Sequence, residues 1–219
     1  WMEDNQWAWV LDEPLPVDDH GHMHVDSGAV IEGQMFYMRF IGANPQSQVM
    51  PEHKFSTYHN YYQGNNPSKW ASKVPLYGII NYQSLYPGVD LKVYGDINHL
   101  KYDFEVAVGA DPAQIRIEYD GLENIELKNG QLHLDARVHQ IVEEAPIAYQ
   151  WINDQQVPVK CEYALKGTVL SYHFPEGYRK DLPLVIDPTL IFSTFTGSLS
   201  DNWGYTATYD DDGTTYYEA

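Results

Sequence analysis

Four carboxylic acids stand where the acid and base of a glycosidase could be built: Asp90, Asp103, Glu105 and Asp187. Such an enzyme needs two carboxyl groups about 5 to 9.5 Å apart in a cleft, one with a raised pKa. Asp103 and Glu105 alternate with apolar residues beside Lys101, a pattern typical of the solvated face of a strand. Asp90 and Asp187 adjoin turn residues, where an aspartate caps backbone N–H groups. We therefore expect a protein without catalytic residues, with a glycoside-active enzyme as the alternative.

Two segments carry side chains that bind metal ions in other proteins. His20, His22 and His24 are spaced two residues apart, which on a strand would place three imidazoles on one face and permit a transition metal. The competing interpretation is a solvated loop, because nothing in the neighbouring sequence requires a strand there. The run 210–213 resembles the start of a calcium loop but lacks the later ligands of an EF-hand, so it fits a hairpin turn better. We expect no resident cofactor, although the acidic composition permits Ca²⁺.

Aromatic and amide side chains are densest between residues 58 and 87. Sugar-binding surfaces use such rings to stack on pyranose C–H groups, while amides meet the hydroxyls. This segment lacks the apolar alternation of a core strand, so some of its rings should be exposed; the alternative is that they pack the end of a β-sandwich. The predicted ligand-binding residues are Tyr58, Asn60, Tyr61, Tyr62, Asn65, Asn66, Trp70 and Tyr77.

The clearest strand pattern lies between Tyr86 and Gly121. Apolar and charged residues alternate over 89–94, 100–108 and 115–119, as expected of half-buried strands. The turn residues at 95–98 separate the first two runs and predict a hairpin. Lys92, Lys101 and Arg116 are expected to pair with Asp103, Glu105 and Glu118 on the solvated face.

Further hairpins are predicted on both sides of this stretch. Residues 34–41 read as a strand followed by a polar stretch, 42–56, and Asn129-Gly130 is a strong hairpin signal. No stretch shows a sustained helical period, so we predict an all-β protein, a β-sandwich-type module of antiparallel hairpins. We divide the chain into an irregular segment (1–30), the β-rich module (31–188) and an incomplete propeller-blade-like repeat (189–219).

The composition limits the partners of this 219-residue chain. Its net charge of −18 argues against nucleic acid and anionic membrane surfaces as partners, since both require a basic footprint. No apolar run approaches the ~20 residues of a membrane span, and motifs of serine hydrolases, zinc proteases and P-loop NTPases are missing. The single cysteine, Cys161, alternates with Val159 and Tyr163, so we predict that it is a buried, unreactive thiol within a strand.

Five separated strings occur in the order of one known family. They are FIGANP (40–45), YHNYYQGNNPSKWAS (58–72), the stretch 86–121, APIAYQ (145–150) and PLVIDPTLIFSTFTGS (183–198). Over roughly residues 31–219 the chain resembles the β-rich N-terminal domain found ahead of SBBP (seven-bladed β-propeller) repeats.

The resemblance implies a location and an architecture. Proteins of this kind are large, secreted, cell-surface proteins of gliding-type Gram-negative bacteria, and they often end in a domain used for type IX secretion. The implied partners are downstream propeller repeats of the same chain and the secretion machinery or a surface glycan. The resemblance carries over no catalytic residue, so we expect a structural or adhesive module rather than an enzyme.

Overall fold

The computed structural model describes residues 5–12, 32–62, 64–95 and 100–188, together with short strands at 190–191, 207–209 and 215–217. Strands dominate these residues, and the described helices are two single 3₁₀ turns, η1 (Pro67–Lys69) and η2 (Pro112–Gln114). All strand pairings are antiparallel. The predicted all-β, sandwich-type class is therefore confirmed.

The described strands form three larger sheets and one small one. The seven-stranded sheet has the order β12 (Gln155–Val159), β11 (Ile147–Ile152), β15 (Leu184–Asp187), β6 (Leu100–Val106), β5 (Val89–Gly95), β4 (Ala71–Tyr86) and β3 (Gln48–Tyr61). The five-stranded sheet has the order β1 (Gln6–Asp12), β2 (Gly33–Phe40), β7 (Arg116–Asp120), β14 (Val169–His173) and β13 (Glu162–Lys166). The four-stranded sheet comprises β16 (Leu190–Ile191), β10 (Gln140–Glu143), β9 (Gln131–Asp135) and β8 (Asn124–Lys128), while β17 (Ala207–Tyr209) pairs with β18 (Thr215–Tyr217).

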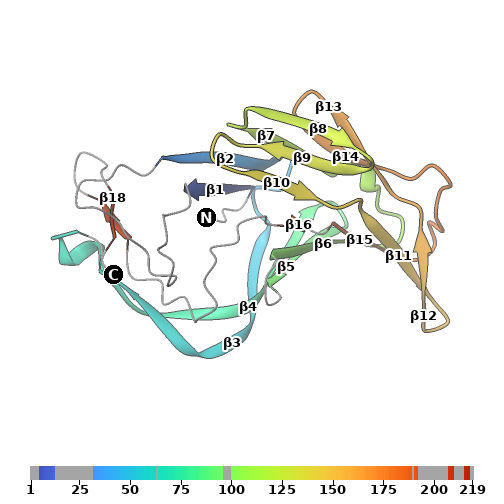
Figure 1. Ribbon diagram of the computed structural model, residues 1–219. Coiled ribbons are helices and arrows are strands. Elements are labelled where there is room, and N and C mark those ends of the chain that lie inside the picture. The colour runs from blue at the N-terminus through green and yellow to red at the C-terminus, as the bar shows by residue number, and fades with distance from the viewer. Residues whose placement is uncertain are drawn as a thin grey trace, which may run out of the picture.

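The five- and four-stranded sheets lie over the inner face of the seven-stranded sheet (Figure 1). Aromatic rings meet edge to face between the layers. Between ring centroids, Trp7 lies 5.5 Å from Tyr102, Phe40 lies 6.4 Å from Phe104, and Phe104 lies 5.8 Å from Tyr172. Each such contact adds about 0.5 to 1.5 kcal/mol beyond the burial of its area. The alternation seen in the sequence therefore does identify the core-facing residues of β5, β6 and β7.

Three details of the strand predictions are wrong. Val108 lies past the end of β6 and is exposed, because the chain turns after Val106. Most of the polar stretch 42–56 belongs to β3, which is exposed along its whole length and so has no apolar alternation to reveal it. The predicted strand through Cys161 is broken: β12 ends at Val159 in one sheet and β13 begins at Glu162 in another, so the chain crosses between layers at the cysteine.

Gly121, which follows β7, adopts a backbone conformation that would destabilise the fold if any other residue had to adopt it. Its φ is +96°, and a Cβ there would lie 2.8 Å from the carbonyl oxygen of Met35. Gly167, in the turn between β13 and β14, also has a positive φ (+61°) but open space around it.

We expect Gly121→Ala to destabilise the protein by about 2 kcal/mol more than Gly167→Ala does. Both variants force alanine into a left-handed conformation, at about 1 kcal/mol, but only Gly121→Ala must also displace backbone. Urea unfolding followed by circular dichroism measures both. Equal losses for the two variants would contradict the packing described at Gly121.

Cys161 is half-buried rather than fully buried, and it packs against the core. Burial raises the pKa of its thiol from 9.0 to about 12. At pH 8 the folded protein should hold roughly a thousandfold less thiolate than the unfolded chain. A thiol reagent should therefore label native Cys161 much more slowly than it labels the protein in urea, and equal rates would refute this environment.

Candidate functional site

The β3–β4 hairpin extends beyond the sandwich as a two-stranded ribbon. Backbone pairing between β4 and β5 extends from Tyr86 only as far as Ile79, opposite Tyr94. Beyond that point, among the described residues, β3 and β4 pair only with each other, and the ribbon projects away from the layered body (Figure 1). We call residues 53–78 the distal hairpin, described apart from residue 63.

Local chemistry explains how the distal hairpin keeps its shape without a core. The Oδ1 atom of Asn66 accepts hydrogen bonds from the backbone N–H of Ser68 (3.0 Å) and from its hydroxyl (2.9 Å), which caps η1 at the tip. The indole Nε1 of Trp70 donates to the carbonyl of Gly64 (3.0 Å). Asn60 Oδ1 accepts from the backbone N–H of Lys73 (2.8 Å), where φ is +56°. Register shifts on either side of Tyr58 and His59 twist the ribbon.

All eight predicted ligand-binding residues lie on this one hairpin. Four of their rings are exposed, at 51% for Tyr58, 41% for Tyr61, 53% for Tyr62 and 44% for Trp70. Tyr62 and Trp70 meet edge to face with centroids 5.4 Å apart, and Tyr77 is half-buried. The rings therefore do not pack the end of the sandwich, which was the competing interpretation.

The asparagines divide into two kinds. Asn60 and Asn66 use their side-chain oxygens to hold the hairpin backbone, as described above. Asn65 is exposed, and its side chain makes no hydrogen bond with the described part of the chain. Of the three amides, Asn65 is thus the freest to meet a ligand.

The sequence prediction missed the contribution of β3 to the same surface. Met50 and Phe55 are exposed on it, and the Phe55 ring lies so close to Gly78 that a Cβ there would be 3.4 Å from its Cζ. Lys54 stands opposite Tyr77 in the ladder, so the two side chains project from one face. The absence of apolar alternation in 48–57 was the available signal, because it indicates a strand with no buried face.

Two of the four candidate carboxylates are neighbours on the outer face of the seven-stranded sheet. Ile186 pairs with Phe104, so the next residues along the two strands, Asp187 and Asp103, lie side by side. The Tyr94 hydroxyl donates to Asp103 Oδ1 at 3.2 Å. Burial, followed by the Asp187 charge, raises the pKa of Asp103 to about 6, and burial raises that of Asp187.

The burial of Asp103 corrects one of the predictions, because its side chain is only 8% exposed instead of lying on a solvated face. The Oδ1 atom of Asp187 has no hydrogen-bond partner among the described residues, and the predicted capping role of this aspartate stays a prediction. Asp90 does cap as predicted, because its Oδ1 accepts from the Ser84 N–H at 2.6 Å, and Glu105 is exposed. The expected surface ion pairs of Asp103 and Glu105 are not among those in the described part of the chain.

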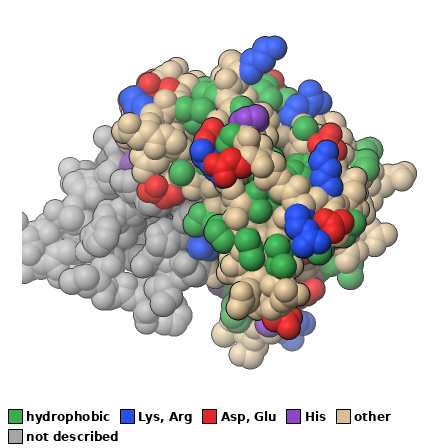
Figure 2. Space-filling model, turned by 90° about the vertical axis from the view of Figure 1, so that its right-hand side faces the viewer, with side chains coloured by type: hydrophobic (Ala, Val, Ile, Leu, Met, Phe, Trp, Pro, Cys, Tyr) green, Lys and Arg blue, Asp and Glu red, His purple; other side chains and the backbone are tan. Residues whose placement is uncertain are grey.

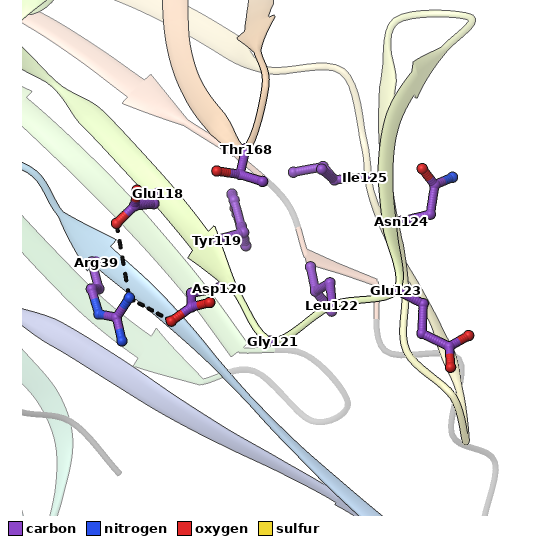
Figure 3. Close-up of a pocket in the computed structure, with 10 residues that line it drawn as sticks. All are labelled: Arg39, Glu118, Tyr119, Asp120, Gly121, Leu122, Glu123, Asn124, Ile125 and Thr168. Atoms are coloured by element: carbon purple, nitrogen blue, oxygen red, sulfur yellow. Dashed lines mark hydrogen bonds and ion pairs between the residues drawn. The ribbon is translucent and has the colours of Figure 1, made fainter.

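A cavity of about 480 Å³ opens where β7 ends and β8 begins (Figure 3). Arg39 lies at its wall, with Nη1 2.6 Å from Asp120 Oδ2 and 3.9 Å from Glu118 Oε2. Two carboxylates thus already neutralise this guanidinium, so the cavity does not favour an anion. It contains neither Asp103 nor Asp187.

The sandwich core holds a carboxyl group that sequence reasoning did not single out. Glu143 is fully buried on β10, and its Oε1 accepts from the hydroxyls of Tyr102 (2.9 Å) and Tyr163 (2.5 Å). Its Oε2 and the hydroxyls of Tyr119 and Tyr172 make no hydrogen bond of ordinary geometry. Burial raises the pKa of Glu143 to about 7, against the lowering effect of the two tyrosines.

The residues that the structure describes contain no cluster of three or more histidine, cysteine or acidic side chains arranged to hold a metal ion. His20, His22, His24 and the run 210–213 lie outside the described residues, so the metal predictions stay predictions. Among the described elements, none is a helix long and apolar enough to span a membrane.

Residues 2–189 match the family described as Domain of unknown function (DUF7948), and the chain therefore belongs to that family. Searches of curated proteins and of solved structures returned no match. The matched range contains β1 to β15, and so all of the sandwich except β16, together with the β3–β4 hairpin, which therefore belongs to the family's domain.

We expect the protein to be more stable at pH 5 than at pH 8. The folded-state pKa of Glu143 lies near 7, above its ordinary 4.5, so its stabilising proton is fully bound below pH 4.5 and is lost as pH rises through 7. The loss should be on the order of 3 kcal/mol, and Asp103 acts in the same direction.

Urea unfolding at pH 5, 6, 7 and 8 measures this dependence. Glu143→Gln keeps an oxygen acceptor for Tyr102 and Tyr163 and should flatten most of the decline. Glu52→Gln, at an exposed position of β3, is the control and should leave the decline unchanged. A Glu143→Gln curve as steep as that of the wild type would show that Glu143 is not responsible.

Proposed function

We propose that this protein is a non-catalytic structural and interaction module of a large secreted cell-surface protein. In this proposal the sandwich is a rigid base, and the β3–β4 hairpin binds an extended polar ligand such as a glycan without doing chemistry on it. The observation that carries the proposal is the set of exposed aromatic rings on a ribbon that projects beyond the sandwich.

The distribution of exposed apolar side chains supports an interaction role. Seven of the thirteen large hydrophobic residues that are exposed in the described chain lie on β3, β4 or the tip between them: Val49, Met50, Phe55, Tyr58, Tyr61, Tyr62 and Trp70. Soluble proteins rarely leave such residues gathered in one place unless they meet a partner. Tyrosine and tryptophan are also the side chains that bind sugars and peptides at low entropic cost, because they have few rotatable bonds.

The surroundings of the carboxylates support binding rather than catalysis. Asp103 is hydrogen-bonded to Tyr94, Asp90 caps a backbone N–H, and Glu143 is enclosed by the core. None of the three lies on the distal hairpin. A glycosidase would need its acid and base beside the surface that holds the sugar.

The location and partners are inferred from the family resemblance of the strings described above. It supports secretion, by a type IX route, to the surface of a gliding-type bacterium, with adhesion or gliding as the setting. The partners would be downstream propeller repeats in the same chain and a surface glycan. A single hairpin offers few contacts, so weak binding would gain strength from repetition across a cell surface.

Substitution of exposed rings tests this function. Tyr58→Ala should weaken binding to a glycan identified on an array by about fivefold, because one stacking contact is worth about 1 kcal/mol. Tyr58 is a better target than Trp70, whose indole also holds Gly64 and so contributes to the shape of the tip.

The matched control is Trp151→Ala, which removes a ring that is 56% exposed on β11 of the body. Affinity is measured by isothermal titration, and folding is checked by thermal unfolding of each variant. Equal losses of affinity in Tyr58→Ala and Trp151→Ala would place the binding surface elsewhere. The absence of any bound glycan or polysaccharide would remove the proposed function altogether.

A further inference from the structure

The distal hairpin differs in charge from the rest of the protein. Residues 53–78 contain three lysines and two histidines and no aspartate or glutamate, whereas the whole chain has 13 basic and 31 acidic residues. The hairpin thus carries a formal charge of +3, and the remainder has 10 basic and 31 acidic residues, a charge of −21. Aromatic rings and cations are gathered on one arm of an acidic protein.

The three lysines are free to bind a ligand. Lys54, Lys69 and Lys73 are exposed, and none of the ion pairs within the described residues involves them. Several cations of the body are already neutralised, among them Lys128 by Glu126 and Arg179 by Asp181. On the face of the body shown in Figure 2, basic side chains lie next to acidic ones, in keeping with these pairs.

Two of the lysines lie beside aromatic rings, and the third adjoins an asparagine that holds the hairpin backbone. Lys54 stands opposite Tyr77 in the ladder. Lys69 ends η1 and directly precedes Trp70, whose ring meets Tyr62. Lys73 follows in β4, and its backbone N–H is held by Asn60. Lys54 and Lys69 therefore lie next to possible stacking surfaces.

The acidic body does not cancel the charge at the tip of the hairpin. Eight residues of β4, 71–78, extend beyond the last backbone pair with β5, which corresponds to about 25 Å at ~3.3 Å per residue. Charges are screened over about 8 to 10 Å at physiological ionic strength. A ligand at the tip consequently meets Lys69 and Lys73 more strongly than the carboxylates of the sandwich, whereas Lys54 lies at the base of the hairpin, two residues from Glu52.

We propose that the ligand of the distal hairpin is an anionic polysaccharide, with its carboxylate or sulfate groups on Lys54, Lys69 and Lys73 and its ring C–H faces on the exposed aromatics. This inference rests on the proposed binding function and names the chemical class of the ligand. The positive charge of the lysines favours an anionic ligand. The exposed rings and Asn65 favour a saccharide over an acidic peptide, because a peptide has no pyranose face to stack on the rings.

The experiment compares two oligosaccharides of similar length, a polyuronate hexamer and a neutral cellohexaose, by isothermal titration with the whole chain. The polyuronate should bind at least about tenfold more tightly in 50 mM salt and lose most of that advantage in 500 mM salt. The triple variant Lys54→Gln, Lys69→Gln, Lys73→Gln should lose the advantage too. These lysines are exposed and make no ion pair within the described chain, so the unfolding temperature of the triple variant should equal that of the wild type.

Lys166→Gln is the matched control, because this exposed lysine in the β13–β14 hairpin also makes no ion pair within the described residues. It should leave polyuronate binding intact. Equal affinity for both hexamers would overturn the anionic assignment and leave the proposed function standing. The anionic assignment would also be overturned if the triple variant still bound polyuronate, or if poly-glutamate bound as tightly as polyuronate. If neither hexamer bound, both the anionic assignment and the proposed binding function would be wrong.

Discussion

The packing of the layers depends on the inner face of β6. Two neighbouring inward residues of that strand, Tyr102 and Phe104, contact rings from the opposite layer: Trp7 from β1, Phe40 from β2 and Tyr172 from β14. Because T-shaped pairs require defined ring orientations, these contacts determine how the sheets sit on each other as well as how much surface they bury. The strands that flank β6 are paired with it, so their positions follow from the same arrangement.

The same tyrosine connects the aromatic packing to the buried carboxyl of β10. Tyr102 donates to Glu143, and Tyr163 of β13 donates to the same oxygen, so one carboxyl group links strands from all three larger sheets. Burial of a carboxylate is costly unless it is well hydrogen-bonded, and here one oxygen remains without a partner. The protonated acid is therefore the form that this core accommodates best, and the stability of the module is tied to pH.

The β3–β4 hairpin is built on the opposite physical principle. Its distal part, residues 53–78, has no fully buried residue among those described and relies on backbone pairing, an asparagine cap and an indole hydrogen bond at its tip. Regions with few buried contacts belong to the least stable part of a fold, and binding surfaces are often drawn from them. A rigid sandwich with a projecting basic, aromatic arm separates the requirements of folding from those of recognition.

Local pattern determined most of what sequence reasoning predicted correctly. The alternation around Leu91, Phe104 and Ile117 identified half-buried strands, and the turn at Asn129-Gly130 identified a hairpin, because period and turn chemistry depend on neighbouring residues. The aromatic residues of the candidate site were also found, since the absence of alternation between residues 58 and 77 indicates rings with no core to enter.

Tertiary structure determined which residues far apart in the sequence are neighbours in space. β15 pairs with β6 although about eighty residues separate them, and that pairing places Asp187 next to Asp103 and buries both in part. The burial of Glu143 follows from the packing of β10 over Tyr102, which no local period reveals. The sequence by itself thus determined the strands, the turns and the composition of the hairpin. Only the folded chain decided which carboxyl groups are buried and that the hairpin extends beyond β5, because both depend on contacts between residues far apart in the sequence.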